Sequence, residues 1–142
     1  MTLDDVRSLL GAPSPAVLTT TRRDGSPLTT PVWFRFTGEA FEVVIAEDDV
    51  KLRHLARDAR CTLVVFEAVP PFRGVEVRGE AVLERVDVTE ARRSIAGRYL
   101  GAEAGERFAA ERASKPGVLL RLVPDDPRVW DLRAIIGIES AS

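Results

Sequence analysis

The run Gly74–Glu84 alternates apolar and charged side chains more regularly than any other part of the sequence. Val75 and Val77 fall on one face of an extended chain, whereas Glu76 and Arg78 fall on the other. A period of two residues is typical of a strand with one face buried and one face in water. Such half-buried strands belong to antiparallel sheets, because the strands of parallel sheets are covered on both faces. This run therefore predicts an antiparallel β protein.

Shorter runs, some alternating and one (61–67) continuously apolar, are joined mostly by tight turns and predict the other strands. Asp24-Gly25 between two of them is a strong hairpin signal. The predicted strands cover residues 16–21, 28–36, 40–46, 61–67, 74–84, 118–123 and 129–136. Helices are predicted over residues 3–10, directly after 47–49, from 87 to 101 and over 103–113. This order favours a mainly β, α+β fold, an antiparallel barrel with peripheral short helices, as one domain over residues 1–142.

Composition limits the classes of partner. The formal net charge is −2, so nothing predicts affinity for nucleic acid or an anionic membrane surface. No apolar run approaches the roughly 20 residues of a membrane helix, and no basic-then-apolar leader opens the sequence. We therefore expect a soluble, cytoplasmic protein with no membrane partner.

Reactive side chains are scarce. The chain has one histidine, His54, and one cysteine, Cys61, so it cannot assemble a metal site rich in these residues. It contains no nucleophile-elbow, Walker or dinucleotide-binding motif. A protein of this kind either performs no chemistry or takes its chemistry from a cofactor.

One segment has the features of an anion site. The predicted strand 40–46 runs into a short helix that opens with carboxylates, carries Lys51 in its first turn and has His54 three residues later. Unpaired N–H groups and the positive end of the helix dipole, together with a cation, make a site for a phosphate-sized anion. Arg53 on the same helix is a further candidate for an anionic group. The alternative is that Lys51, Arg53 and His54 are ordinary surface residues of a helix.

Four segments carry a resemblance to a known family. In order and spacing, residues 17–27, 30–34, the helix at Lys51 and residues 74–81 resemble the pyridoxamine 5′-phosphate oxidase-like split-barrel family. Within that family the chain is most similar to the flavin- or deazaflavin-dependent oxidoreductases, in the branch that uses coenzyme F420. The resemblance implies a six-stranded antiparallel split β-barrel that forms a homodimer, with cofactor sites at the dimer interface.

The resemblance also implies which residues hold the cofactor. Lys51 stands where the family contacts the cofactor phosphate, and His54 stands where the family often has an amide near the tail. Where the family commonly has a basic residue before the lysine, this chain has Asp49 and Val50. The second strand is expected to line the ring system with Thr29, Thr30, Pro31, Val32 and Trp33.

The implied activity is hydride transfer from reduced coenzyme F420 to a small organic substrate. Two alternatives stay open: an FMN-dependent oxidase or reductase of the pyridoxamine 5′-phosphate oxidase type, and a non-catalytic protein that binds a flavin, a deazaflavin or haem. The sparse basic residues near Lys51 favour the deazaflavin, because the compact FMN phosphate would call for several converging cations. No residue is predicted as a proton donor.

Overall fold

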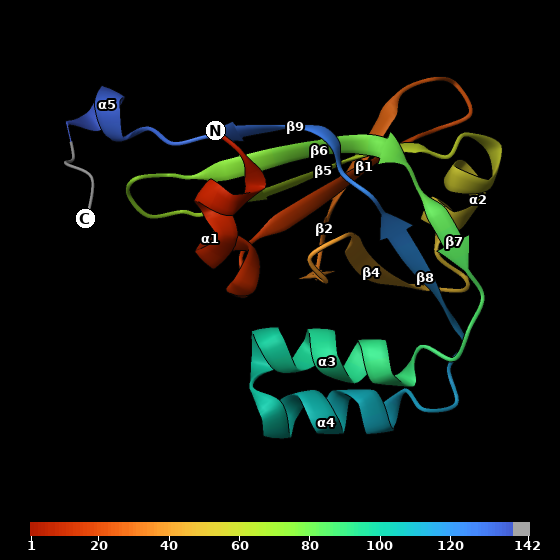
Figure 1. The fold of residues 1–142 in the computed structure, drawn as a ribbon. Coiled ribbons are helices and arrows are strands. Elements are labelled where there is room, and N and C mark those ends of the chain that lie inside the picture. Colours follow the sequence, from red (N-terminus) through yellow and green to blue (C-terminus); the bar gives the residue numbers. More distant parts are fainter. Residues whose placement is uncertain (138–142) are drawn as a thin grey trace.

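Residues 1–137, which this computed structural model describes, contain nine strands in two antiparallel sheets (Figure 1). The strands are β1 (Ala16–Thr21), β2 (Pro27–Val32), β3 (Arg35–Phe36), β4 (Phe41–Ala46), β5 (Arg60–Phe66), β6 (Gly74–Glu80), β7 (Val82–Glu84), β8 (Gly117–Leu122) and β9 (Asp125–Trp130). The helices are the 3₁₀ turn η1 (Leu3–Val6), α1 (Arg7–Gly11), α2 (Val50–Arg57), α3 (Thr89–Leu100), α4 (Ala102–Glu111) and α5 (Arg133–Ile136). The expected mainly β, α+β class with antiparallel sheets is confirmed.

Three bends carry the chain from one sheet to the other. The five-stranded sheet has the order β2-β1-β5-β6-β9 and the four-stranded sheet has the order β3-β4-β8-β7. The bends lie between β2 and β3, between β6 and β7, and between β8 and β9. The predicted strands 28–36 and 74–84 are therefore each divided in two. Pro31 lies opposite Val17 in β2, which is an edge strand of the five-stranded sheet as a proline within a strand favours, and the chain bends after Val32.

The two sheets enclose one apolar core. Leu18 and Leu63 contribute from the five-stranded sheet, and Phe41 and Leu120 contribute from the four-stranded sheet. Each of these side chains is at most 1% exposed. Full burial of such a side chain contributes about 1.5–3 kcal/mol, so this shared interior holds the two sheets together.

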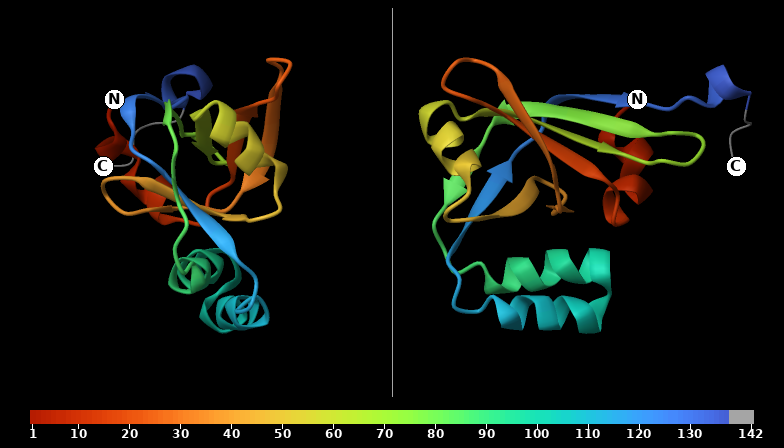
Figure 2. Two further views of the ribbon diagram at one scale, coloured as in Figure 1. Left: turned by 90° about the vertical axis from the view of Figure 1, so that its right-hand side faces the viewer. Right: turned by 180° about the vertical axis from the view of Figure 1, so that it is seen from behind.

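The helices α3 and α4 form a hairpin outside the sheets (Figure 2). Val88 and Ala91 of this hairpin pack against Leu119 and Val44 on the outer face of the four-stranded sheet. The two helices approach closely at Gly105, where a Cβ atom would lie 2.5 Å from the Cα of Gly97. The hairpin is thus a separate layer that covers part of one sheet.

The segment after β9 differs from the sequence prediction. A strand was expected over 129–136, but the chain leaves β9 at Trp130 and forms the short helix α5. The carboxylate of Asp131 accepts a hydrogen bond from the backbone N–H of Arg133 at 2.8 Å, which turns the chain into this helix. Ile135 and Ile136, whose apolar character suggested a strand, are exposed.

A matched pair of glycine substitutions tests the helix contact. Gly105→Ala should lower the midpoint of thermal unfolding, since overpacking costs about 1–3 kcal/mol and exceeds the roughly 1 kcal/mol gained in helix propensity. Gly97→Ala should leave the midpoint unchanged or raise it, because a Cβ there meets no atom within 4 Å. Thermal melts followed by circular dichroism measure both, and an equal effect of the two variants would contradict the close crossing.

Candidate functional site

The start of α2 is built around one carboxylate. Asp49 is the N-cap residue, and its side chain accepts a hydrogen bond from the backbone N–H of Lys51 at 2.9 Å. The other carboxylate oxygen accepts from the Lys51 ammonium, also at 2.9 Å. Partial burial acts to raise the pKa of Asp49, but the hydrogen bonds and charge of Lys51 outweigh it and the pKa is lowered. The expected carboxylate cap is therefore Asp49, and it also neutralises Lys51.

A cavity of about 280 Å³ lies beside this cap. It brings together the end of β2, the strand β4, the first turn of α2 and the inner side of the helical hairpin. The lining residues are Pro31, Val32, Trp33, Val43, Val44, Ile45, Ala46, Asp49, Lys51, Arg92, Ile95, Phe108 and Arg112. Four of the predicted cofactor residues, Lys51 and 31–33, thus border the same space.

Aromatic rings form one wall of the cavity. The indole of Trp33 stacks on the ring of Tyr99 with centroids 5.2 Å apart and planes 11° apart. It also contacts Phe108 at 5.3 Å in a tilted arrangement. Trp33 keeps 36% of its surface exposed, so this wall combines a fixed ring with an accessible face.

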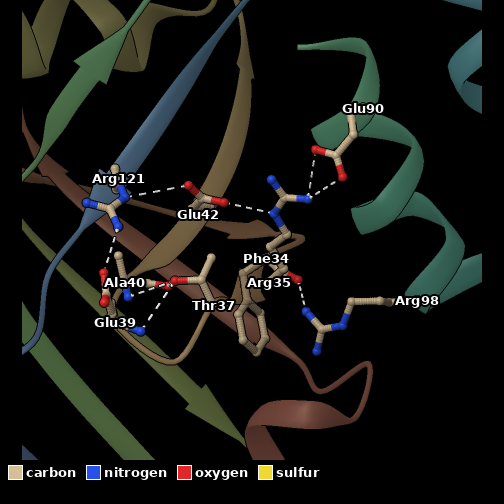
Figure 3. Close-up of polar contacts among 9 residues, drawn as sticks. All are labelled: Phe34, Arg35, Thr37, Glu39, Ala40, Glu42, Glu90, Arg98 and Arg121. Carbon is tan, nitrogen blue, oxygen red and sulfur yellow. Dashed lines mark hydrogen bonds and ion pairs between the residues drawn. The ribbon is translucent and has the colours of Figure 1, made fainter.

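Polar contacts hold the hairpin beside this wall (Figure 3). The guanidinium of Arg98 donates hydrogen bonds to the carbonyl oxygens of Phe34, of Leu10 at 2.9 Å and of Ala12 at 2.6 Å. Nearer the start of α3, Arg35 of β3 donates to Glu90 at 3.0 Å. The same Arg35 side chain reaches Glu42 of β4 at 2.8 Å. The sheet and the hairpin are therefore joined at two points along α3.

Two arginines of the hairpin face the cavity and were not predicted from the sequence. Arg92 is 8% exposed and donates to the backbone carbonyls of Arg112 at 2.9 Å and Lys115 at 3.1 Å. The guanidinium of Arg112 lies 3.6 Å from the ring centroid of Phe108. A signal for Arg92 was present, since it lies four residues after Val88 and three before Ile95 and so belongs to the apolar stripe of α3.

His54 and Arg53, two of the predicted cofactor residues, do not line this cavity. His54 is buried, and its Nδ1 atom lies 3.0 Å from the hydroxyl of Thr20. Arg53 is exposed on α2. Their contact with a cofactor stays a prediction.

The two predicted threonines also lie outside the cavity lining. The hydroxyl of Thr29 lies 2.9 Å from that of Thr19 on the exposed face of the sheet. The buried hydroxyl of Thr30 has no hydrogen-bond partner within residues 1–137. A buried hydroxyl without a partner costs about 1–3 kcal/mol. A bound group that accepted a hydrogen bond from Thr30 would remove this cost, so Thr30 is a better candidate for such a contact than Thr29.

Sequence comparison assigns the family. The pyridoxamine 5′-phosphate oxidase family matches residues 2–131. The chain belongs to this family. No match to a curated protein was found. The family assignment agrees with the resemblance seen in the sequence.

Similar solved structures share the fold. A conserved hypothetical protein from Mycobacterium tuberculosis has a TM-score of 0.77 at 22% identity, with 100% of this chain and 91% of that chain covered. A protein named F420 reductase has a TM-score of 0.65 at 24% identity, with coverage of 86% and 94%. HutZ, a haem storage protein from Vibrio cholerae, has a TM-score of 0.64 at 14% identity, with coverage of 90% and 92%.

Residues 1–137 contain neither a candidate membrane-spanning helix nor a cluster of metal ligands. No helix in this part of the chain has the length and apolar character needed to cross a membrane. The same residues contain no group of three or more histidine, cysteine, aspartate or glutamate side chains arranged to hold a metal ion.

The buried position of His54 predicts a pH effect on stability. Burial, followed by the charges of Arg57, Arg22 and Arg53, lowers the pKa of His54 below its usual value. The unfolded chain therefore takes up this proton at a higher pH than the folded chain, so stability falls as the pH drops through about 6.5. Thermal melts between pH 8 and pH 5 should show a smaller decline for His54→Gln than for the unsubstituted protein. Parallel declines would contradict a pH-dependent role for His54.

Proposed function

We propose that this protein is an oxidoreductase that transfers hydride from reduced coenzyme F420 to a small organic substrate. The main support is the composition of one cavity, which is lined by cationic side chains, by an aromatic wall and by the end of the edge strand β2. Lys51, Arg92 and Arg112 supply the cations, and Trp33 supplies the ring. The family assignment and the similarity in fold to a protein named F420 reductase support the same proposal.

The residues present fit a ring cofactor with an anionic tail. Ammonium and guanidinium groups are the donors that bind phosphate and carboxylate groups well. The lining carries three such cations against one carboxylate, Asp49, so an anion is favoured there. Lys51 of α2 is thus available to a phosphate of the tail, and Arg92 and Arg112 of the hairpin are available to a second anionic group.

Each part of the cavity then has a role. Lys51 binds the phosphate of the tail from the first turn of α2, and Asp49 orients its ammonium. Residues 31–33 pack against the ring, and the hairpin excludes water from the side opposite β4. A bound deazaflavin would supply the hydride chemistry, while the protein supplies position and dry surroundings.

A second copy of the chain belongs to this proposal. If each bent pair of strands counts as one strand, the pairings join six strands in the order β1, β5, β6/β7, β8/β9, β4 and β2/β3. Six strands are the number expected of a split barrel, so we propose that the chain forms a split-barrel homodimer with its cofactor sites at the interface, in the cytoplasm. The exposed Thr29, Thr30 beside it, Arg53 and His54 are then candidates for contacts with the cofactor.

Titration with both candidate cofactors tests the function. The protein purified from a host that lacks deazaflavin should be colourless and should shift or quench the fluorescence of added F420. A yellow protein with FMN absorbance would replace the proposal with the FMN alternative. Binding of F420 with no reduction of any compound in a broad substrate screen would favour a carrier.

Removal of one cation tests the place of the phosphate. Lys51→Ala should weaken F420 binding by about 1–3 kcal/mol, the range for a lost charge-assisted hydrogen bond. Lys115→Ala is the matched control, because Lys115 is the only other lysine and does not line the cavity. Fluorescence titration measures both variants, and unchanged affinity in Lys51→Ala would remove Lys51 from the site.

A further inference from the structure

Arg92 is a buried cation with no counter-ion in contact. Within residues 1–137, no carboxylate lies within ion-pair distance of its guanidinium, and its hydrogen bonds go to the backbone carbonyls of Arg112 and Lys115. Both bonds use the same nitrogen, Nη1. Burial, with the nearby charge of Arg112, lowers the pKa of Arg92, and Asp87 only partly offsets this.

Arg98, a half-buried arginine of the same helix, shows the difference. Arg98 uses both Nη1 and Nη2 on three carbonyl oxygens and stacks over the ring of Phe34 at 4.8 Å. Its donors are committed to holding the hairpin. Nη2 and Nε of Arg92 have no hydrogen-bond partner in the described chain, and neither atom is fully buried, so both are open to a ligand.

The cavity places a second guanidinium beside the first. Arg112 covers the ring of Phe108, and its nearest carboxylate contact is Glu111 at 3.7 Å on an exposed surface. Lys51, by contrast, is held by Asp49 at 2.9 Å. The cavity cations that lack a close carboxylate partner therefore lie on the hairpin side. They are Arg92 and Arg112.

We propose that Arg92 and Arg112 form an anion-binding subsite for the substrate, so that the substrate carries a carboxylate or phosphate group next to a flat ring. The anion pairs with the two guanidinium groups, and the ring lies against Phe108. Two planar guanidinium groups suit such an anion, since each can donate two parallel hydrogen bonds. The assignment to the substrate rests on the proposed function, whereas the subsite itself does not.

Binding of simple probes to the full chain tests the subsite. Benzoate carries the anion and the ring, and benzamide has nearly the same shape without the charge. Benzoate should bind the unsubstituted protein at least about tenfold more tightly than benzamide does, measured by calorimetry and by the rise in the thermal midpoint. Inorganic phosphate, compared with sodium chloride at equal ionic strength, shows whether the subsite also takes phosphate.

Three variants identify the groups responsible. Arg92→Met should remove the preference for benzoate over benzamide, and Arg112→Met, which leaves the bonds of Arg92 to the backbone in place, should reduce it. Arg93→Met is the matched control, because Arg93 is the next residue of α3, is exposed and pairs with Glu106. If Arg92→Met does not fold, the subsite is still tested by Arg112→Met and by the comparison of benzoate with benzamide on the unsubstituted protein.

Each outcome supports or overturns the proposal. Equal binding of benzoate and benzamide, a preference that survives both Arg92→Met and Arg112→Met, or its loss in Arg93→Met would overturn the subsite. F420 titration of the same samples separates this result from the proposed function. An arginine-dependent preference without F420 binding would leave the subsite standing and reject the proposed function, whereas F420 binding without the preference would reject the subsite alone.

Discussion

The bend between β2 and β3 is the constraint on which the arrangement of this molecule depends. Phe34 lies at that bend with its side chain fully buried in the core, and its backbone belongs to neither sheet. Buried backbone groups need hydrogen-bond partners. Both partners come from α3: the hydroxyl of Tyr99 accepts from the N–H of Phe34 at 3.4 Å, and Arg98 donates to its carbonyl. The bend therefore fixes the position of the helical hairpin.

The cavity follows from the same bend. Because Phe34 points into the core, the preceding residue points outward, and Trp33 stacks on Tyr99 beside the two polar contacts. The hydroxyl of Tyr99 also donates to the carbonyl of Ser14 at 2.9 Å, which ties α3 to the start of β1. One wall of the cavity is thus held by packing and hydrogen bonds before any ligand binds, and such preorganisation lowers the entropic cost of binding.

The sequence predicted the strands well because their periodicity is local, and it failed where tertiary contacts decide. The strand 16–21 was predicted with its observed bounds, since β-branched residues and the Asp24-Gly25 turn that follows are local signals. The break at 33–34 was missed because its partners lie 64 and 65 residues further along the chain. After Trp130, apolar residues suggested a strand, but the chain turns into a helix where the carboxylate of Asp131 accepts a hydrogen bond from the backbone N–H of Arg133.

The candidate site divides in the same way. Lys51 could be predicted from a local pattern, because a cation stands in the first turn of a capped helix, whereas residues 31–33 were implied by the resemblance to the family. Arg92 was missed although it belongs to the apolar stripe of α3, because a helical arginine in an arginine-rich chain is normally solvated, and packing against β8 and α4 is what buries it. Asp49, which stands near the place where the family commonly has a basic residue, pairs with Lys51. With three cations and one carboxylate in the lining, the attraction for an anion comes mainly from the hairpin.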